Sequence, residues 1–198
     1  MGKVIDAVIF VLYPLLVLVG MTYLGIRLTA VILLLFVGRR IIALLLANKA
    51  ETRVVLYQAA AMGVIMGAAA LSESPIALRA APFFISLTFI FTFAISLRTT
   101  PLIERFARMT DPELSEEEVQ YCRNLTKVWV AVLSCNSMLV FGAAFVEDHV
   151  LWSILVGPVS YSVLGSVFVF EYPYRKYRFR KFNDKNPADR LLKKLFKS

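Results

Sequence analysis

The sequence predicts an all-α protein: a polytopic membrane helix bundle of about six transmembrane helices, with a C-terminal basic amphipathic helix. Of its 198 residues, 59% are hydrophobic and only 18% are charged, which leaves too little polar surface for a soluble domain. The apolar stretches are long and continuous, a pattern typical of membrane helices and not of the alternating strands of a barrel. Helices also satisfy the backbone hydrogen bonds that hydrocarbon leaves without water.

The expected spans follow one another along the chain. They cover about residues 4–22, 23–46, 53–71, 75–97, 119–146 and 150–171. Each of the last four is long enough to cross about 30 Å of hydrocarbon at about 1.5 Å per residue. The first two are separated only by a few residues around Gly25, and Arg39 and Arg40 interrupt the second. A re-entrant hairpin is the alternative for this pair. We expect the first span to be retained, because no small-residue cleavage site follows it.

The placement of Arg and Lys predicts the orientation. One side of the membrane would hold Lys3, the Arg39–Arg40 pair, the loop after residue 97 and the tail. The other side would hold Arg27, Arg79 and the acidic Glu147–Asp148 turn. Because cytoplasmic segments are enriched in Arg and Lys, both termini are expected in the cytoplasm.

The expected boundary separates a transmembrane domain, residues 1–171, from a basic cytoplasmic tail, residues 172–198. Residues 171–198 contain ten Lys or Arg and three acids, a net +7 of the whole chain's +8. Bases beside tyrosines at the end of a span favour binding to anionic lipid headgroups. The candidate headgroup-binding residues are Arg175, Lys176, Arg178, Arg180, Lys181, Arg190, Lys193 and Lys194. After Pro187, apolar residues on one face predict an amphipathic helix lying on the membrane. Nucleic-acid binding is the disfavoured alternative.

The fifth span carries the best candidate polar site. Thr126, Trp129 and Asn136 recur at helical spacing with Leu133 and Val140, so they share a face.

Arg123 and Lys127 precede that face near the predicted cytoplasmic end, where they could reach phosphates or carbonyls. One interpretation is a polar pocket for a headgroup or a carrier-linked substrate. The other, which we favour, is a helix–helix hydrogen bond made by Asn136.

No catalytic set is visible, and we expect neither a metal nor a cofactor. His149 lies in the acidic turn without a second histidine, so a solvated turn is favoured over a metal site. Cys122 and Cys135 lie about 20 Å apart along one helix, too far for a disulfide.

Local signals predict further details of the fold. Pro101 should precede a short interfacial helix, Ser115 and Glu118 match a capping box, and Gly157–Pro158 should widen the last span. Gly63 and Gly67 form a GxxxG pair that permits close helix packing.

The segments 101–108 (PLIERFAR), 111–114 (DPEL) and 121–129 (YCRNLTKVW), followed by Asn136, resemble an uncharacterised family of bacterial inner-membrane proteins. Members of that family occur in aryl-polyene (xanthomonadin-type) biosynthesis clusters. Trp152, Tyr161 and Glu171 also fit its pattern, and the chain is more distantly similar to the intracellular septation protein A family. The resemblance implies a Gram-negative inner membrane and a link to envelope lipid or polyene production. It implies no reaction.

Three functions remain open. The first, which we favour, is an accessory protein that organises peripheral biosynthetic enzymes at the membrane. The second is a small transporter or flippase for a lipid-like product. The third is a membrane acyl or glycosyl transferase, which would need a histidine, an acid pair or a metal motif near the membrane. The oligomeric state is left open.

Overall fold

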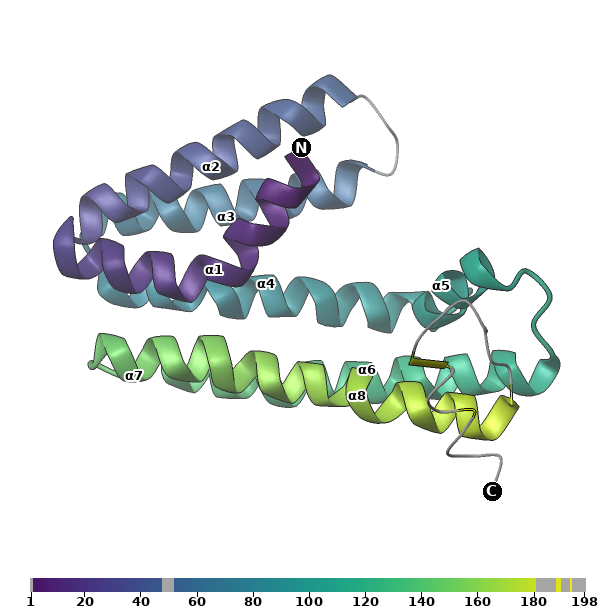
Figure 1. The fold of residues 1–198 in the computed structure, drawn as a ribbon. Coiled ribbons are helices and arrows are strands. Elements are labelled where there is room, and N and C mark those ends of the chain that lie inside the picture. The colour runs from purple at the N-terminus through teal and green to yellow at the C-terminus, as the bar shows by residue number, and fades with distance from the viewer. Residues whose placement is uncertain (1, 48–51, 181–187, 190–192, 194–198) are drawn as a thin grey trace.

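The computed structural model describes residues 2–47, 52–180, 188, 189 and 193, which form helices and contain no strand (Figure 1). The elements are α1 (Gly2–Tyr23), α2 (Ile26–Ala47), α3 (Thr52–Ser72), α4 (Pro75–Ser96), α5 (Leu102–Thr110), α6 (Glu116–Ala143), α7 (His149–Ile154), the π-helical turn η1 (Leu155–Val159) and α8 (Ser160–Phe179). The all-α prediction is confirmed. α7, η1 and α8 form one continuous helix of 31 residues, called here the final helix.

Three helices are long and apolar enough to cross a membrane: Pro75–Ser96, Glu116–Ala143 and His149–Phe179. Their outward faces carry large apolar side chains, such as Phe91, Met138 and Phe170, which are 61%, 75% and 75% exposed. Water would not tolerate so much contiguous apolar surface, whereas lipid would. The described residues therefore identify a membrane-type bundle.

The helices are joined by turns that alternate between two ends of the bundle (Figure 1). The α1–α2, α3–α4 and α6–α7 turns lie at one end, called here the Gly25 end. Gly25 has φ +80°, a conformation that favours glycine, which confirms the turn predicted there. α5, the start of α6 and the end of α8 lie together at the opposite end, called here the α5 end.

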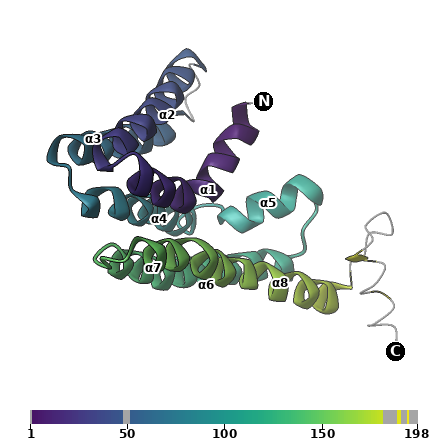
Figure 2. The same cartoon turned by 60° about the vertical axis from the view of Figure 1, so that its left-hand side comes forward.

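The bundle consists of two parts that meet along α1 and α4. α4, α6 and the final helix run side by side, while the α2–α3 hairpin leans away from them (Figure 2). α1 bends between the two parts, and Pro14 lies inside it, which removes a helical hydrogen bond.

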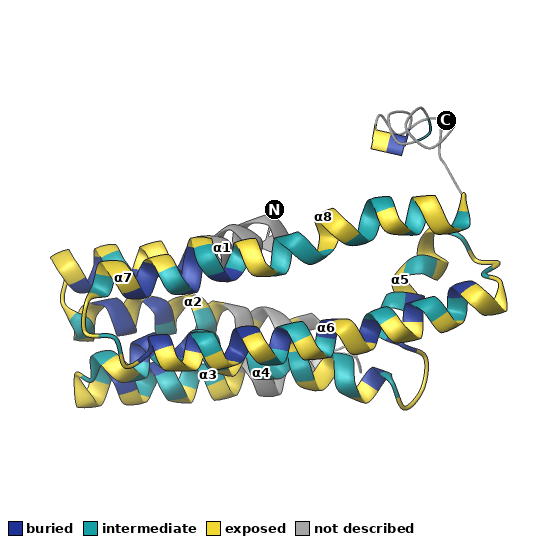
Figure 3. Ribbon diagram, turned by 90° about the horizontal axis from the view of Figure 1, so that it is seen from below, coloured by how far each residue is buried: buried dark blue, intermediate teal, exposed yellow. Residues whose placement is uncertain are grey.

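The core lies toward the Gly25 end, where all of the long helices meet (Figure 3). Trp152 is fully buried there among Val17, Met66 and Leu78 from α1, α3 and α4. The Tyr13 hydroxyl donates a hydrogen bond of 2.9 Å to the Leu78 carbonyl, joining α1 to α4. This packing fixes α6 and α7, which carry the candidate site.

Three helices of the bundle have bounds that differ by three residues or more from those predicted, and one of them, α2, begins at Ile26 and not at residue 23. The final helix continues to Phe179, beyond the predicted end at residue 171, because it keeps its contacts with α6 along that stretch. α6 begins at Glu116 and ends at Ala143, three residues earlier than predicted at both ends. Its start is set by the capping box.

Candidate functional site

α6 positions the predicted polar face. It begins at the predicted capping box, in which the Ser115 hydroxyl accepts a hydrogen bond from the Glu118 N–H and the Glu118 carboxylate accepts one from the Ser115 N–H. The face is then buried along its whole length, as helical spacing predicts. It comprises Thr126, Trp129, Leu133, Asn136 and Val140.

The cap-proximal half of this face is fully occupied by contacts within the protein. The Thr126 hydroxyl donates to the Cys122 carbonyl at 2.8 Å, so it satisfies itself within α6. The Trp129 ring packs between Phe93 of α4 and Phe168 of α8, with centroid distances of 6.0 and 4.7 Å. Trp129 therefore joins three helices, and the Thr126 hydroxyl is already paired within α6.

Asn136 is different, because its amide oxygen is buried without a partner. The residue is 4% exposed, and among the described residues no donor reaches its Oδ1 atom. The next residue, Ser137, is 3% exposed, and its hydroxyl is likewise unpaired. The indole N–H of Trp152, on the neighbouring α7, also lacks an acceptor. The interhelical hydrogen bond expected from the Asn136 oxygen is therefore not made within the described part of the chain.

The π-helical turn lies close to the level of Asn136 and Ser137. The contacts Trp129–Phe168 and Tyr121–Tyr174 set an antiparallel register that brings Asn136 beside η1. η1 contains the Gly157–Pro158 pair, so the predicted local widening is confirmed. A Cβ at Gly157 would lie 3.5 Å from Pro14, which shows that η1 also packs against α1. Asn136, Ser137 and η1 thus lie in one layer of the bundle.

Arg123 and Lys127 do not join this layer. Both side chains are exposed on the outer surface of α6, and Arg123 donates a hydrogen bond of 2.9 Å to the Leu97 carbonyl at the end of α4. The five residues predicted as one polar site therefore separate. Thr126, Trp129 and Asn136 are internal, and the two cations are external.

Three of the eight tail bases predicted to bind lipid are paired with carboxylates in the described part of the chain. Arg178 lies 2.8 Å from Glu117 of α6, Arg175 lies 3.1 Å from Glu171, and Lys176 lies 2.7 Å from Asp189. Arg180 lies over the Tyr177 ring. Lys193 is half-buried, and Lys181, Arg190 and Lys194 lie outside the described residues, as does most of the predicted amphipathic helix.

These pairs belong to a network that joins α6 to α8. The Tyr121 hydroxyl donates to Glu171 at 3.3 Å, and its ring stacks on Tyr174 at 6.1 Å and meets the edge of Phe179 at 5.3 Å. This network was not predicted from the sequence. The signal for this network was a set of tyrosines and bases on one helix, with acids at the matching distance on the preceding helix.

The contacts of Arg79 are a second feature that was not predicted from the sequence. Arg79 is 4% exposed, and it donates to the Val146 and Glu147 carbonyls at 2.6 and 2.8 Å. It also contacts the Nδ1 atom of His149. The α6–α7 turn is therefore bonded to α4 and is not simply solvated. The Nδ1 atom of His149 already has Arg79 as a partner. The signal was an arginine inside a predicted span, on the same predicted side of the membrane as the acidic Glu147–Asp148 turn.

No metal centre is present in the described chain, where no three His, Cys, Asp or Glu residues gather. An open apolar depression of about 550 Å³ lies between residues 34–42 of α2 and Gly63 of α3. A Cβ at Gly63 would meet Val37 at 3.7 Å, whereas one at Gly67 would meet nothing within 4 Å. Close packing is thus seen at the first glycine of the GxxxG pair and not at the second.

Comparison with known proteins gives no match to a family model, to a curated protein or to a solved structure. The interpretation of the site therefore depends on its own contacts.

Proposed function

We propose that this chain is a six-span inner-membrane protein with cytoplasmic termini, whose α5 end is a rigid platform that docks peripheral biosynthetic enzymes. The observation that carries the proposal is the projecting, cross-linked pair of helices at that end. The class of partner comes from the resemblance to proteins of aryl-polyene-type clusters and is itself part of the proposal.

The lengths of the helices support six spans. α1, α2 and α4 have 22 residues each and α3 has 21, which corresponds to about 32–33 Å at 1.5 Å per residue. Each is about as long as the hydrocarbon layer is thick. Together with α6 and the final helix they make six, with turns at alternating ends.

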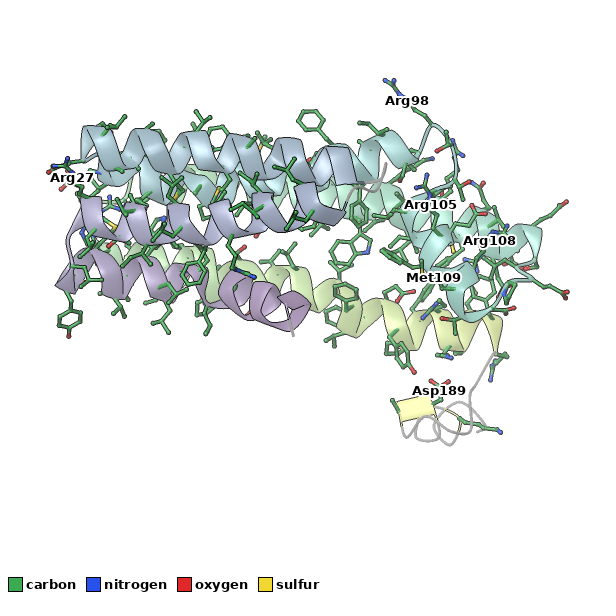
Figure 4. All side chains as sticks on the ribbon, turned by 90° about the horizontal axis from the view of Figure 1, so that it is seen from above. Arg27, Arg98, Arg105, Arg108, Met109 and Asp189 are labelled. Carbon is green, nitrogen blue, oxygen red and sulfur yellow. The ribbon has the colours of Figure 1, made fainter. Side chains whose placement is uncertain are left out.

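The charges at the two ends support the orientation. Arg98, Arg105 and Arg108 lie at the α5 end, and Arg27 lies at the Gly25 end (Figure 4), where the buried Arg79 also lies. Arg27 also has Glu73 at 3.6 Å, so its charge is partly offset. The excess of Arg at the α5 end favours the cytoplasm for that end.

The platform projects beyond the end of α4. Because Arg123 reaches the Leu97 carbonyl, residues 116–122 of α6 extend past α4 by about 10 Å. α8 accompanies them to Phe179 and is tied to them by Arg178–Glu117 and by the Tyr121 contacts. α5 lies against α6 with its Glu104 buried and paired to Arg108 at 2.8 Å. This unit needs little ordering when a partner binds, which favours affinity.

The platform also presents apolar contact residues. Phe106 and Met109 of α5 are 54% and 79% exposed, with Arg105 and Arg108 beside them on the same helix. Aromatic residues, Met and Arg are the types enriched in protein interfaces. This surface therefore suits a protein partner.

Photo-crosslinking in the native host tests the docking function. A photoreactive amino acid at Met109 should crosslink to soluble enzymes encoded in the same biosynthetic cluster. The same probe at Leu71, which is 86% exposed at the Gly25 end, is the matched control and should not crosslink to them. Equal yields from the two positions, or no such enzyme at Met109, would contradict the docking function.

A second candidate function, movement of a lipid-like product, is favoured by one observation. Asn136, Ser137 and Trp152 hold unpaired polar atoms inside the bundle, as a passing polar group would require. In this case Asn136→Leu should abolish product movement while the protein still inserts and folds. Unchanged movement in that variant would exclude this function.

A further inference from the structure

We propose that Arg98, Arg105, Arg123 and Lys127 bind the phosphate of an anionic phospholipid at the turn between α4 and α5. These four residues are called here the α4–α5 corner. The site goes beyond the docking function, and it rests on the membrane placement proposed above.

Two guanidinium groups converge on the same short turn from different helices. Arg123 of α6 donates to the Leu97 carbonyl at 2.9 Å. Arg105 of α5 donates to the Thr100 carbonyl at 3.0 Å and to the Thr99 hydroxyl at 3.3 Å. Arg98 lies within this turn, and Figure 4 shows it at the outer edge of the α5 end. Arg105 and Arg123 thus bring two positive charges to the turn, and Arg98, whose exposed side chain projects outward from it (Figure 4), adds a third.

Lys127 adds a fourth charge one helical turn from Arg123. Positions four apart on a helix lie on one side of it, and both residues are exposed. Arg123 holds the turn through its Nη2 atom, and Arg105 does so through Nε and Nη2. The donors that remain to face an anion are Nε and Nη1 of Arg123, Nη1 of Arg105 and the Lys127 ammonium.

The charge of the corner is not neutralised by the protein. Within the described chain, none of its four cations forms an ion pair with a carboxylate. Other bases at the same end do so, and each has its own acid: Arg108 with Glu104, Arg175 with Glu171, Lys176 with Asp189 and Arg178 with Glu117. Like charges held together repel one another, and a bound anion removes that cost. The separation of paired from unpaired bases therefore marks the corner as the anion site.

The depth of the corner matches that of lipid phosphate. α4 ends at Ser96 after 22 residues, about the thickness of the hydrocarbon layer. The Trp129 ring, only two residues from Lys127, packs on Phe93, which lies three residues before the end of α4, so Lys127 lies close to the level at which α4 ends. A long lysine side chain at that level reaches outward to the headgroups. The phosphate is therefore assigned to a lipid and not to a soluble molecule.

Lipid retention by the purified full-length protein tests the proposal. The protein is placed in nanodiscs of phosphatidylcholine with phosphatidylglycerol, released into detergent, and weighed by native mass spectrometry with its bound lipids. The double variant Arg98→Gln/Lys127→Gln removes two charges whose side chains make no hydrogen bond within the described chain. It should lower retention of phosphatidylglycerol by about tenfold, since each base near a membrane surface contributes appreciably. Arg105→Gln should lower retention in the same direction.

The matched control is Arg175→Gln/Arg178→Gln, which removes two charges from the same end. Because those bases already have carboxylate partners, this variant should retain phosphatidylglycerol within about twofold of the parent protein. Equal losses in the two double variants would overturn the corner as a distinct site. Unchanged retention in Arg98→Gln/Lys127→Gln would overturn it as well.

Inorganic phosphate distinguishes the source of the anion. In excess it should not displace phosphatidylglycerol from the parent protein, because it lacks acyl chains held by the surrounding helices. Displacement would show a soluble-phosphate site and overturn the lipid assignment. Failure of the protein to enter nanodiscs would instead refute the membrane placement. If lipid retention is normal but a probe at Met109 gives no crosslinks, the docking function alone is refuted.

Discussion

Replacing Asn136 with leucine should stabilise the bundle, contrary to the usual effect of altering a buried polar residue. The Asn136 oxygen is buried and unpaired, and a buried acceptor without a donor costs about 1–3 kcal/mol. Leucine has a similar size and no such oxygen. We therefore expect the free energy of unfolding to rise by about 1 kcal/mol or more in Asn136→Leu.

The assay is equilibrium unfolding in mixed micelles, followed by the fluorescence of Trp129 and Trp152. Leu133→Ala, one turn away on the same buried face, is the control for sensitivity and should lose about 2 kcal/mol or more. If Asn136 instead made an interhelical hydrogen bond, its leucine variant would lose roughly 0.6 kcal/mol. A loss of that size would refute our interpretation of the unpaired oxygen. A gain in stability together with lost product movement would show that the amide is kept for function.

Two further substitutions test the packing of the bundle. Gly20→Ala should destabilise by about 1–3 kcal/mol, because its Cβ would lie 2.6 Å from the short Thr29 side chain, and thermal unfolding measures the loss. The matched variant Gly165→Ala, whose Cβ would meet nothing within 4 Å, should gain about 0.5 kcal/mol from helix propensity, and a loss there would contradict the packing of α8. Trp129→Ala should lower the free energy of unfolding by about 3 kcal/mol in the same assay, because the Trp129 ring packs between α4 and α8. A loss below about 1 kcal/mol would show that these ring contacts contribute little.

Much of the fold was predictable because the signals for membrane helices come from residues that are close together in the sequence. Continuous apolar runs, the Gly25 turn and the Ser115–Glu118 capping box each depend on a few neighbouring residues, and all three are confirmed. The buried face of α6 follows from helical spacing alone. Gly157 and Pro158 together indicated the π-helical turn for the same reason.

The site was less predictable because its contacts join distant segments. Nothing local to Arg79 shows that it will reach carbonyls 67 and 68 residues away. Likewise, the bases after residue 171 suggested lipid binding, but Arg178 pairs with Glu117 across 61 residues. Only the antiparallel register of α6 and α8 brings those groups together. The same register decides which of the described bases are paired with acids, and the lipid site proposed at the α4–α5 corner depends on it.

The orientation of the bundle is the claim on which the docking platform depends. It can be measured by labelling single cysteines in spheroplasts with a membrane-impermeant maleimide, after Cys122 and Cys135 are replaced by serine. Glu73 and Glu113 are exposed acids in turns at the Gly25 end and the α5 end. We predict that Glu73→Cys is labelled from outside and that Glu113→Cys is labelled only after permeabilisation. The reverse pattern, or labelling of both from outside, would contradict the cytoplasmic platform.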